Sequence, residues 1–156
     1  MKQVAAKNKR INIWQYQFIL ARRLAWWSMG SFCTGVVLFW MEPFLRGFGI
    51  QAIAWGLVDA AIAVGGTMLT TRRRSKLPDP TAAEAVQKEA DKLWKLRWWM
   101  FFLDGVYVLV GLVMALTLGR KDAWWLGTGV GVVVQGLFLL GFDWYHAKNV
   151  PTTGKE

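Results

Sequence analysis

The chain has 156 residues and a mass of 17.7 kDa, which is enough for one domain. It is 54% hydrophobic, contains 11 tryptophans and carries a formal net charge of +9. Such a charge on a soluble domain would suggest nucleic-acid binding, but a chain this apolar has too little polar surface for a soluble globule. No nucleic-acid recognition motif is present, so the composition argues against that partner and indicates a membrane protein.

Four apolar runs predict transmembrane helices, since about 20 residues are needed to cross the hydrocarbon layer. They contain 18, 25, 21 and 20 residues and lie at 24–41, 47–71, 98–118 and 123–142. None shows the polar stripe of a helix in a soluble bundle. We therefore predict an all-α integral membrane bundle of four transmembrane helices. Because the connections at 43–46 and 119–122 are short, consecutive helices should form two antiparallel hairpins.

The basic residues predict the orientation. Sixteen of the 19 lie in the N-terminal arm, in the central loop with its flanks and in the tail, all on one side of the predicted bilayer. Basic residues accumulate on the cytoplasmic side. We therefore predict a multi-pass protein of the bacterial inner membrane with both termini in the cytoplasm. The first run shows no signal-peptide cleavage pattern and should remain as an anchor.

The segments outside the spans are predicted to be partly helical. An interfacial N-terminal helix is expected within 1–23, with Ile11, Trp14 and Phe18 on one face. Hairpins at 24–71 and 98–143 flank a basic cytoplasmic loop and helix at 72–97, and 144–156 forms a cytoplasmic tail. In the central segment, Thr81 and Glu84 match a capping box. The helix that follows should continue into the third span as its cytoplasmic extension.

Basic residues next to the spans predict contact with anionic lipid headgroups, at about 1 kcal/mol per charge near the surface. These residues are Arg22, Arg23, Arg72, Arg73 and Arg74. Basic residues at these positions are expected in any membrane protein of this orientation, so they give no support to a nucleic-acid partner.

Polar residues inside the apolar runs are the candidate site. Asp59 is the thirteenth of 25 residues in the second span, where an acid costs about 2.5–3.5 kcal/mol to insert. Asp104 and Tyr107 share one face of the third span, and Gln135 lies in the fourth. In a structural interpretation, Asp59, Tyr107 and Gln135 bond across helices. In a functional one, Asp59 and Asp104 bind a proton, a cation or a polar ligand.

Small and aromatic residues give two further expectations. Trp55 and Gly56 precede Asp59 in the second span and are candidate ligand-facing residues for a lipid, quinone or pigment. Gly127 and Gly131 are spaced as a helix-packing motif in the fourth span.

Several kinds of site are not expected. With one cysteine, Cys33, and one histidine, His146, the chain has neither an internal disulfide nor a histidine- or cysteine-rich metal site. It also lacks a nucleophile–base pair and a phosphate loop. We therefore expect no catalytic residues, no metal and no cofactor, and hence a protein that is not an enzyme.

Three motifs carry a family resemblance. They are the segment 55–59 (WGLVD), the segment 103–111 (LD-x-x-Y-x-x-x-G) and the segment 135–143 (QG-x-x-LL-x-FD). Over 52–143 the chain resembles an uncharacterised family of small bacterial four-helix membrane proteins, a domain of unknown function. The resemblance supports the architecture and implies no activity.

Three functions stay open on the sequence. The first is an accessory, scaffold or assembly subunit that contacts other membrane-protein subunits. The second is a small, dimeric proton- or cation-coupled transporter or channel that uses Asp59, and the third is a lipid, quinone or pigment binder. The environment of Asp59 should separate them, because a dry contact with Gln135 or Tyr107 favours the scaffold and a water-connected cavity favours transport or ligand binding.

We expect Asp59→Asn to keep the fold and the expression level, because interhelical hydrogen bonds in membranes contribute only about 0.6 kcal/mol on average. Membrane yield and the elution profile in detergent measure this. Loss of insertion or assembly would contradict it and would show that the carboxylate has a larger structural role.

Overall fold

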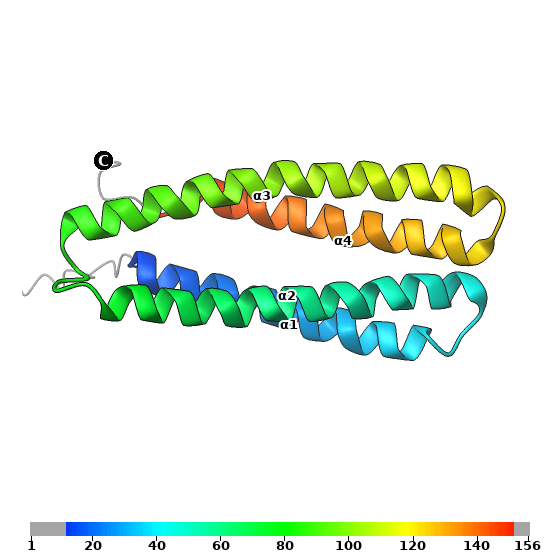
Figure 1. Ribbon diagram of the computed structural model, residues 1–156, viewed down its shortest axis with the longest axis horizontal. Helices are drawn as coiled ribbons and strands as arrows, with labels where there is room; N and C mark the ends of the chain where they lie inside the picture. Colours follow the sequence, from blue (N-terminus) through cyan, green and yellow to red (C-terminus); the bar gives the residue numbers. More distant parts are fainter. Residues whose placement is uncertain (1–11, 152–156) are drawn as a thin grey trace, which may run out of the picture.

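The computed structural model describes residues 12–151, in which all regular elements are helices and no strand is present. Its elements are α1 (Ile13–Leu38), α2 (Pro43–Ser75), α3 (Ala83–Thr117), the 3-10 helix η1 (Leu118–Arg120) and α4 (Ala123–Lys148). The long helices lie lengthwise along the molecule, with α1 beside α2 and α3 beside α4 (Figure 1). Both short connections, α1 to α2 and α3 to α4, are at the same end.

Within residues 12–151, three helices are long and apolar enough to span a membrane. They are Pro43–Ser75, Ala83–Arg120 and Ala123–Lys148. Helix α1 does not qualify, because it ends at Leu38 and its apolar part after Arg22 and Arg23 is too short, so that any window long enough to span includes both arginines. Three of the four predicted spans are thus supported by length and composition, and the first span stays a prediction.

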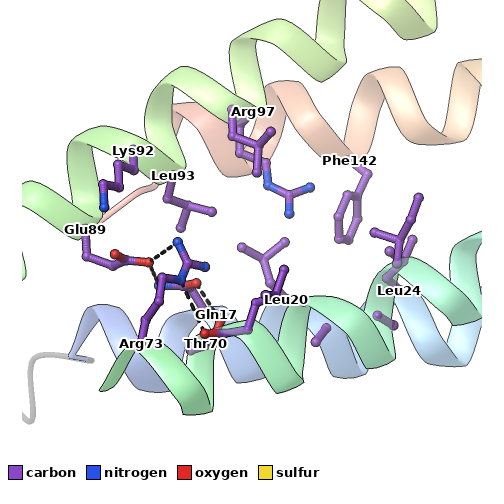
Figure 2. Close-up of a pocket in the computed structure, with 16 residues that line it drawn as sticks. Gln17, Leu20, Leu24, Thr70, Arg73, Glu89, Lys92, Leu93, Arg97 and Phe142 are labelled. Carbon is purple, nitrogen blue, oxygen red and sulfur yellow. Dashed lines mark hydrogen bonds and ion pairs between the residues drawn. The ribbon is translucent and has the colours of Figure 1, made fainter. Parts of the chain in front are cut away.

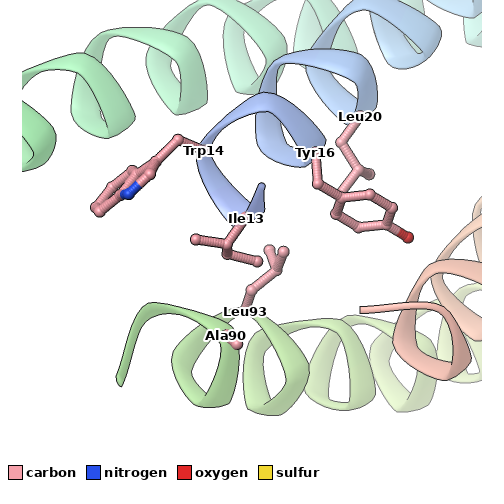
Figure 3. Close-up of a cluster of buried hydrophobic side chains, with 6 residues drawn as sticks. All are labelled: Ile13, Trp14, Tyr16, Leu20, Ala90 and Leu93. Atoms are coloured by element: carbon pink, nitrogen blue, oxygen red, sulfur yellow. The ribbon is translucent and has the colours of Figure 1, made fainter. Parts of the chain in front are cut away.

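The N-terminal segment differs from the sequence prediction. Instead of a separate interfacial helix within 1–23, the described part from Ile13 onward belongs to one continuous helix, α1, and Ile11 lies outside the described residues. The reason is tertiary packing. The start of α1 is buried against the start of α3 in an apolar cluster made of Ile13, Trp14, Tyr16, Leu20, Ala90 and Leu93 (Figure 3).

The start of α3 corrects one local prediction and confirms another. Thr81 does not cap the helix, because its backbone N–H and its hydroxyl both donate to Asp79, at 2.8 and 2.6 Å. These bonds hold the pKa of Asp79 below its ordinary value. Ala82 is the N-cap residue and makes no side-chain cap hydrogen bond. From Ala83, α3 runs without a break to Thr117, as the sequence predicts.

Glycines let the helices approach each other at backbone distance. The two helix pairs meet mainly through α2 and α4. There, a Cβ at Gly127 would collide with the carbonyl oxygen of Phe44, and one at Gly131 would lie 2.9 Å from Cβ of Gln51. The predicted packing role of Gly127 and Gly131 is therefore confirmed. Within the first pair, a Cβ at Gly35 would be 2.6 Å from the carbonyl oxygen of Gly49.

We expect Gly127→Ala to destabilise the bundle by about 1–3 kcal/mol, because the added methyl group forces α2 and α4 apart. Unfolding in detergent measures the change. Gly65→Ala is the matched control, since a Cβ there meets nothing within 4 Å. Its higher helix propensity should leave stability equal or raised. Equal losses in both variants would contradict this account of the interface.

Candidate functional site

Three buried acids from three helices form the acidic centre, defined as Asp59 of α2, Asp104 of α3 and Asp143 of α4. Their exposed fractions are 0%, 4% and 4%. The carboxyl groups are near enough to interact electrostatically, Asp59 with both Asp143 and Asp104. The structure thus brings the two acids singled out in the sequence, Asp59 and Asp104, to a common centre and adds Asp143.

The acidic centre is only partly neutralised. Nη1 of Arg97 donates to Oδ1 of Asp143 at 2.5 Å, and Asp104 is within hydrogen-bonding range of Asp143. Within residues 12–151, neither oxygen of Asp59 has a hydrogen-bond partner, and the same holds for Oδ2 of Asp104. An ionised carboxylate buried without a partner is very costly. The centre is therefore suited to take up a proton or another positive charge.

The acidic centre does not have the arrangement of a multivalent metal site. Across the described part of the chain, no group of three or more histidine, cysteine, aspartate or glutamate side chains is placed to hold a metal ion.

Gln135 bonds across helices, but with α1 and not with Asp59 or Tyr107. Its Oε1 accepts from Nε1 of Trp27 at 2.9 Å, and its Nε2 donates to Oγ of Ser31 at 3.1 Å. Gln135 therefore joins α4 to α1. The dry contact between Asp59 and Gln135 or Tyr107, which would favour a scaffold, is not what the structure contains.

Tyr107, Trp55 and Gly56 make other contacts and do not pair with the free oxygens of the acidic centre. Tyr107 packs edge-on against Trp55, with ring centroids 5.0 Å apart, and does not hydrogen-bond Asp104. The carbonyl of Gly56 accepts from the hydroxyl of Ser28 at 2.6 Å, and a Cβ at Gly56 would lie 2.9 Å from the backbone nitrogen of Phe32. Gly56 thus serves the packing of α1 on α2, which corrects its ligand-facing prediction.

A cavity of about 200 Å³ lies between the two helix pairs (Figure 2). Its wall includes Ala63, which is four residues after Asp59, or one helical turn. Arg97 and Phe142 lie at the end of the cavity nearest to the acidic centre. The cavity thus leads to the Arg97–Asp143 ion pair and ends one turn from Asp59.

A polar network lines the other end of the cavity and joins three helices. Arg73 of α2 pairs with Glu89 of α3, with 2.9 Å between Nη1 and Oε1 (Figure 2). Gln17 of α1 donates to the same oxygen of Glu89 at 3.3 Å and accepts from the hydroxyl of Thr70 at 2.8 Å. We call these four residues the mouth network.

The predicted lipid-contacting arginines separate into three environments. Arg73 belongs to the mouth network, whereas Arg22, Arg72 and Arg74 are exposed. Arg23 is exposed and lies near Tyr16 and His146.

Participants that sequence reasoning missed include Arg97 and Asp143 at the acidic centre, Glu89 in the mouth network and Ser31, which bonds to Gln135. A signal for the first two was available. Arg97 immediately precedes the third predicted span and Asp143 immediately follows the fourth. In an antiparallel pair these positions lie at the same depth, so opposite charges there predict an ion pair. Glu89 and Ser31 depend on helix rotation, which the sequence does not reveal.

A comparison with family models matches residues 23–144, which include the whole acidic centre. The chain belongs to DUF6992, a family of unknown function. The match confirms the resemblance seen in the motifs and extends further than residues 52–143. No curated protein and no solved structure matches this DUF6992 chain.

We expect Arg97→Met to destabilise the DUF6992 chain by about 3–5 kcal/mol, because it leaves Asp143 buried without its cation. The double variant Arg97→Met/Asp143→Leu should recover most of this loss, since it removes both charges. Denaturation in detergent measures both. Arg74→Met, at an exposed arginine, is the control and should change stability by no more than about 0.5 kcal/mol. A double variant as unstable as the single one would contradict the pairing.

Proposed function

We propose that this protein is a non-catalytic, four-span membrane protein that binds a proton or a monovalent cation at its acidic centre, as a small transporter or channel does. The observation that carries the proposal is the pair of buried oxygens of Asp59 that have no hydrogen-bond partner within residues 12–151. Ionisable groups inside membrane segments are functional candidates by default, because insertion opposes them.

The proposed topology places both termini and the mouth network on the cytoplasmic side. It follows from the sequence, in which sixteen of the 19 basic residues lie in segments that an even number of proposed spans separates. It also requires α1 to cross as the fourth span. Three polar residues in the membrane part of α1 are satisfied inside the bundle, where Ser28, Ser31 and Trp27 bond to α2 and α4.

An asymmetry along the bundle supports a pathway to the acidic centre. On the proposed cytoplasmic side, a cavity extends from the mouth network to Arg97, next to the acids. On the opposite side, Gly47 and Gly127 bring α2 and α4 into backbone contact and leave no room for even a methyl group. The arrangement corresponds to a state in which the acidic centre is closer to the cytoplasm than to the outside.

An accessory or assembly subunit is the second candidate. The observation that favours it is on α2, where Gly65 has open space beyond its Cα and does not line the cavity. Small residues on an unoccupied helix face let a second transmembrane helix approach closely. Native purification followed by identification of co-purifying chains tests this candidate, and a lone monomer would contradict it.

We expect proteoliposomes with the wild-type chain to conduct protons or a monovalent cation, and Asp59→Asn to reduce the flux to that of empty liposomes. The amide has the size of the acid but neither takes up a proton nor attracts a cation. A pH-sensitive dye inside the vesicles, with sodium and potassium gradients in separate arms, measures the flux.

Asp91→Asn is the matched control for this assay, because Asp91 undergoes the same chemical change on an exposed turn of α3. Its flux should equal that of the wild type. Flux that is absent from the wild type, or that is equal in Asp59→Asn, would contradict the transport proposal.

A further inference from the structure

A groove opens along the side of the bundle between α1 and α4, apart from the acidic centre. Its volume is about 780 Å³, and it is more open to its surroundings than the cavity at the mouth network. Its wall comes mostly from aromatic residues, among them Trp26, Trp27, Phe138 and Phe142. We call it the lateral groove.

The lateral groove has a flat apolar floor. The rings of Trp27 and Phe138 are stacked, with centroids 3.6 Å apart and planes 7° from parallel. Gly141 lies in the wall, and a Cβ there would meet nothing within 4 Å, so space remains beside it. Trp26 is 65% exposed at the rim. An extended hydrocarbon chain is the kind of group that fits such a surface.

Polar groups lie at one end of the same groove. Arg23 makes no hydrogen bond or ion pair with the described residues, although its charge acts on Tyr16 and His146. The imidazole of His146 is 1% exposed and sits in the groove wall. A guanidinium without a partner beside a buried imidazole forms a site for an anion.

Tyr16 holds the ring of His146 in the wall of the groove. The phenol oxygen lies 2.7 Å from Nδ1, and the phenol hydroxyl is 3.4 Å from the backbone carbonyl oxygen of His146. When Nδ1 of a neutral imidazole accepts, its hydrogen is on Nε2. Nε2 then offers a donor in addition to the guanidinium of Arg23.

We propose that the lateral groove binds one anionic phospholipid of the cytoplasmic leaflet, with the phosphate at Arg23 and His146 and an acyl chain along Trp27 and Phe138. The proposal rests on the membrane placement of α1 and α4 given above, but it is independent of the acidic centre. That placement puts Arg23 at the start of the first span and His146 just beyond the end of the fourth, so both lie at headgroup depth.

The positive charge at one end of the groove and the extended apolar floor beside it favour this occupant. A soluble anion would use the polar end alone and leave the aromatic floor uncovered. A neutral lipid would leave the guanidinium of Arg23 without a counter-charge. A phospholipid with a net negative headgroup satisfies both ends of the groove at once, and the groove opens sideways, from where a lipid arrives.

Native mass spectrometry of the full chain, released from nanodiscs of mixed phosphatidylglycerol and phosphatidylcholine, tests the proposal. We expect the wild type to retain one phosphatidylglycerol in preference to phosphatidylcholine. Arg23→Ala should lower the retained fraction about tenfold or more, as expected for a lost hydrogen bond to a charged group. Arg22→Ala is the matched control, because it removes the same charge from an exposed position outside the groove.

A second pair of variants tests the acyl-chain part of the groove. Gly141→Leu should fold, because its side chain enters open space, and should block retention by filling the groove. Gly65→Leu, on an open face of α2 outside the groove, should retain the lipid as the wild type does. These readouts are masses, so they do not depend on whether the flux assay succeeds.

Three results would overturn the proposal. The first is a wild type that retains no phosphatidylglycerol. The second is an equal loss in Arg22→Ala and Arg23→Ala, which would show diffuse attraction of the headgroups. The third is full retention in Gly141→Leu, which would show a headgroup contact that does not use the groove.

Discussion

The backbone contact between α2 and α4 is the interaction on which the rest of the structure depends. It is the main interface between the two helix pairs, and Gly47, Gly127 and Gly131 make it close enough for a carbonyl oxygen to occupy the place of a side chain. With little apolar driving force between helices in lipid, close packing of this kind is a principal source of association. The same contact sets the rotation of α2 and α4, and so turns Asp59 and Asp143 inward.

Because the two helix pairs meet mainly through α2 and α4, α2 and α3 are further apart, and so are α1 and α4. The space between α3 and the pair formed by α1 and α2 becomes the cavity that ends at Arg97, and the space between α1 and α4 becomes the lateral groove. Side chains bridge the gaps at a few points, such as Trp55 with Tyr107 and Trp27 with Gln135. The two openings differ in chemistry because the mainly apolar wall of the first includes four charged side chains, whereas aromatic residues line most of the second.

Periodicity and spacing in the sequence predict which residues are unusual, but not which residues meet. Asp59 and Asp104 could be selected from the sequence because an acid in an apolar run is expensive wherever the helix points. The partners of Gln135 could not, because a helix that is apolar all round has no stripe to indicate its rotation. The continuity of α1 was also hidden, since its first turns are buried by residues of α3 that lie about 75 positions away in sequence. A local contact can be hidden in the same way: the hydroxyl of Thr81, which a capping box would use to cap α3, bonds to Asp79 instead.

The start of α1 is hydrogen-bonded to α4 and to the loop that precedes α3. Tyr16 bonds to His146, 130 positions later, and Nε1 of Trp14 donates to the carbonyl of Pro80 at 2.8 Å. The chain must therefore be synthesised through residue 146 before α1 can make all of its final contacts. Each helix pair can be inserted on its own, but joining the pairs is a late, post-insertion step of biogenesis. Until the pairs join, the polar atoms of α1 that later bond to α4 lack their hydrogen-bond partners. The chain in this state should be the form most susceptible to quality-control proteases.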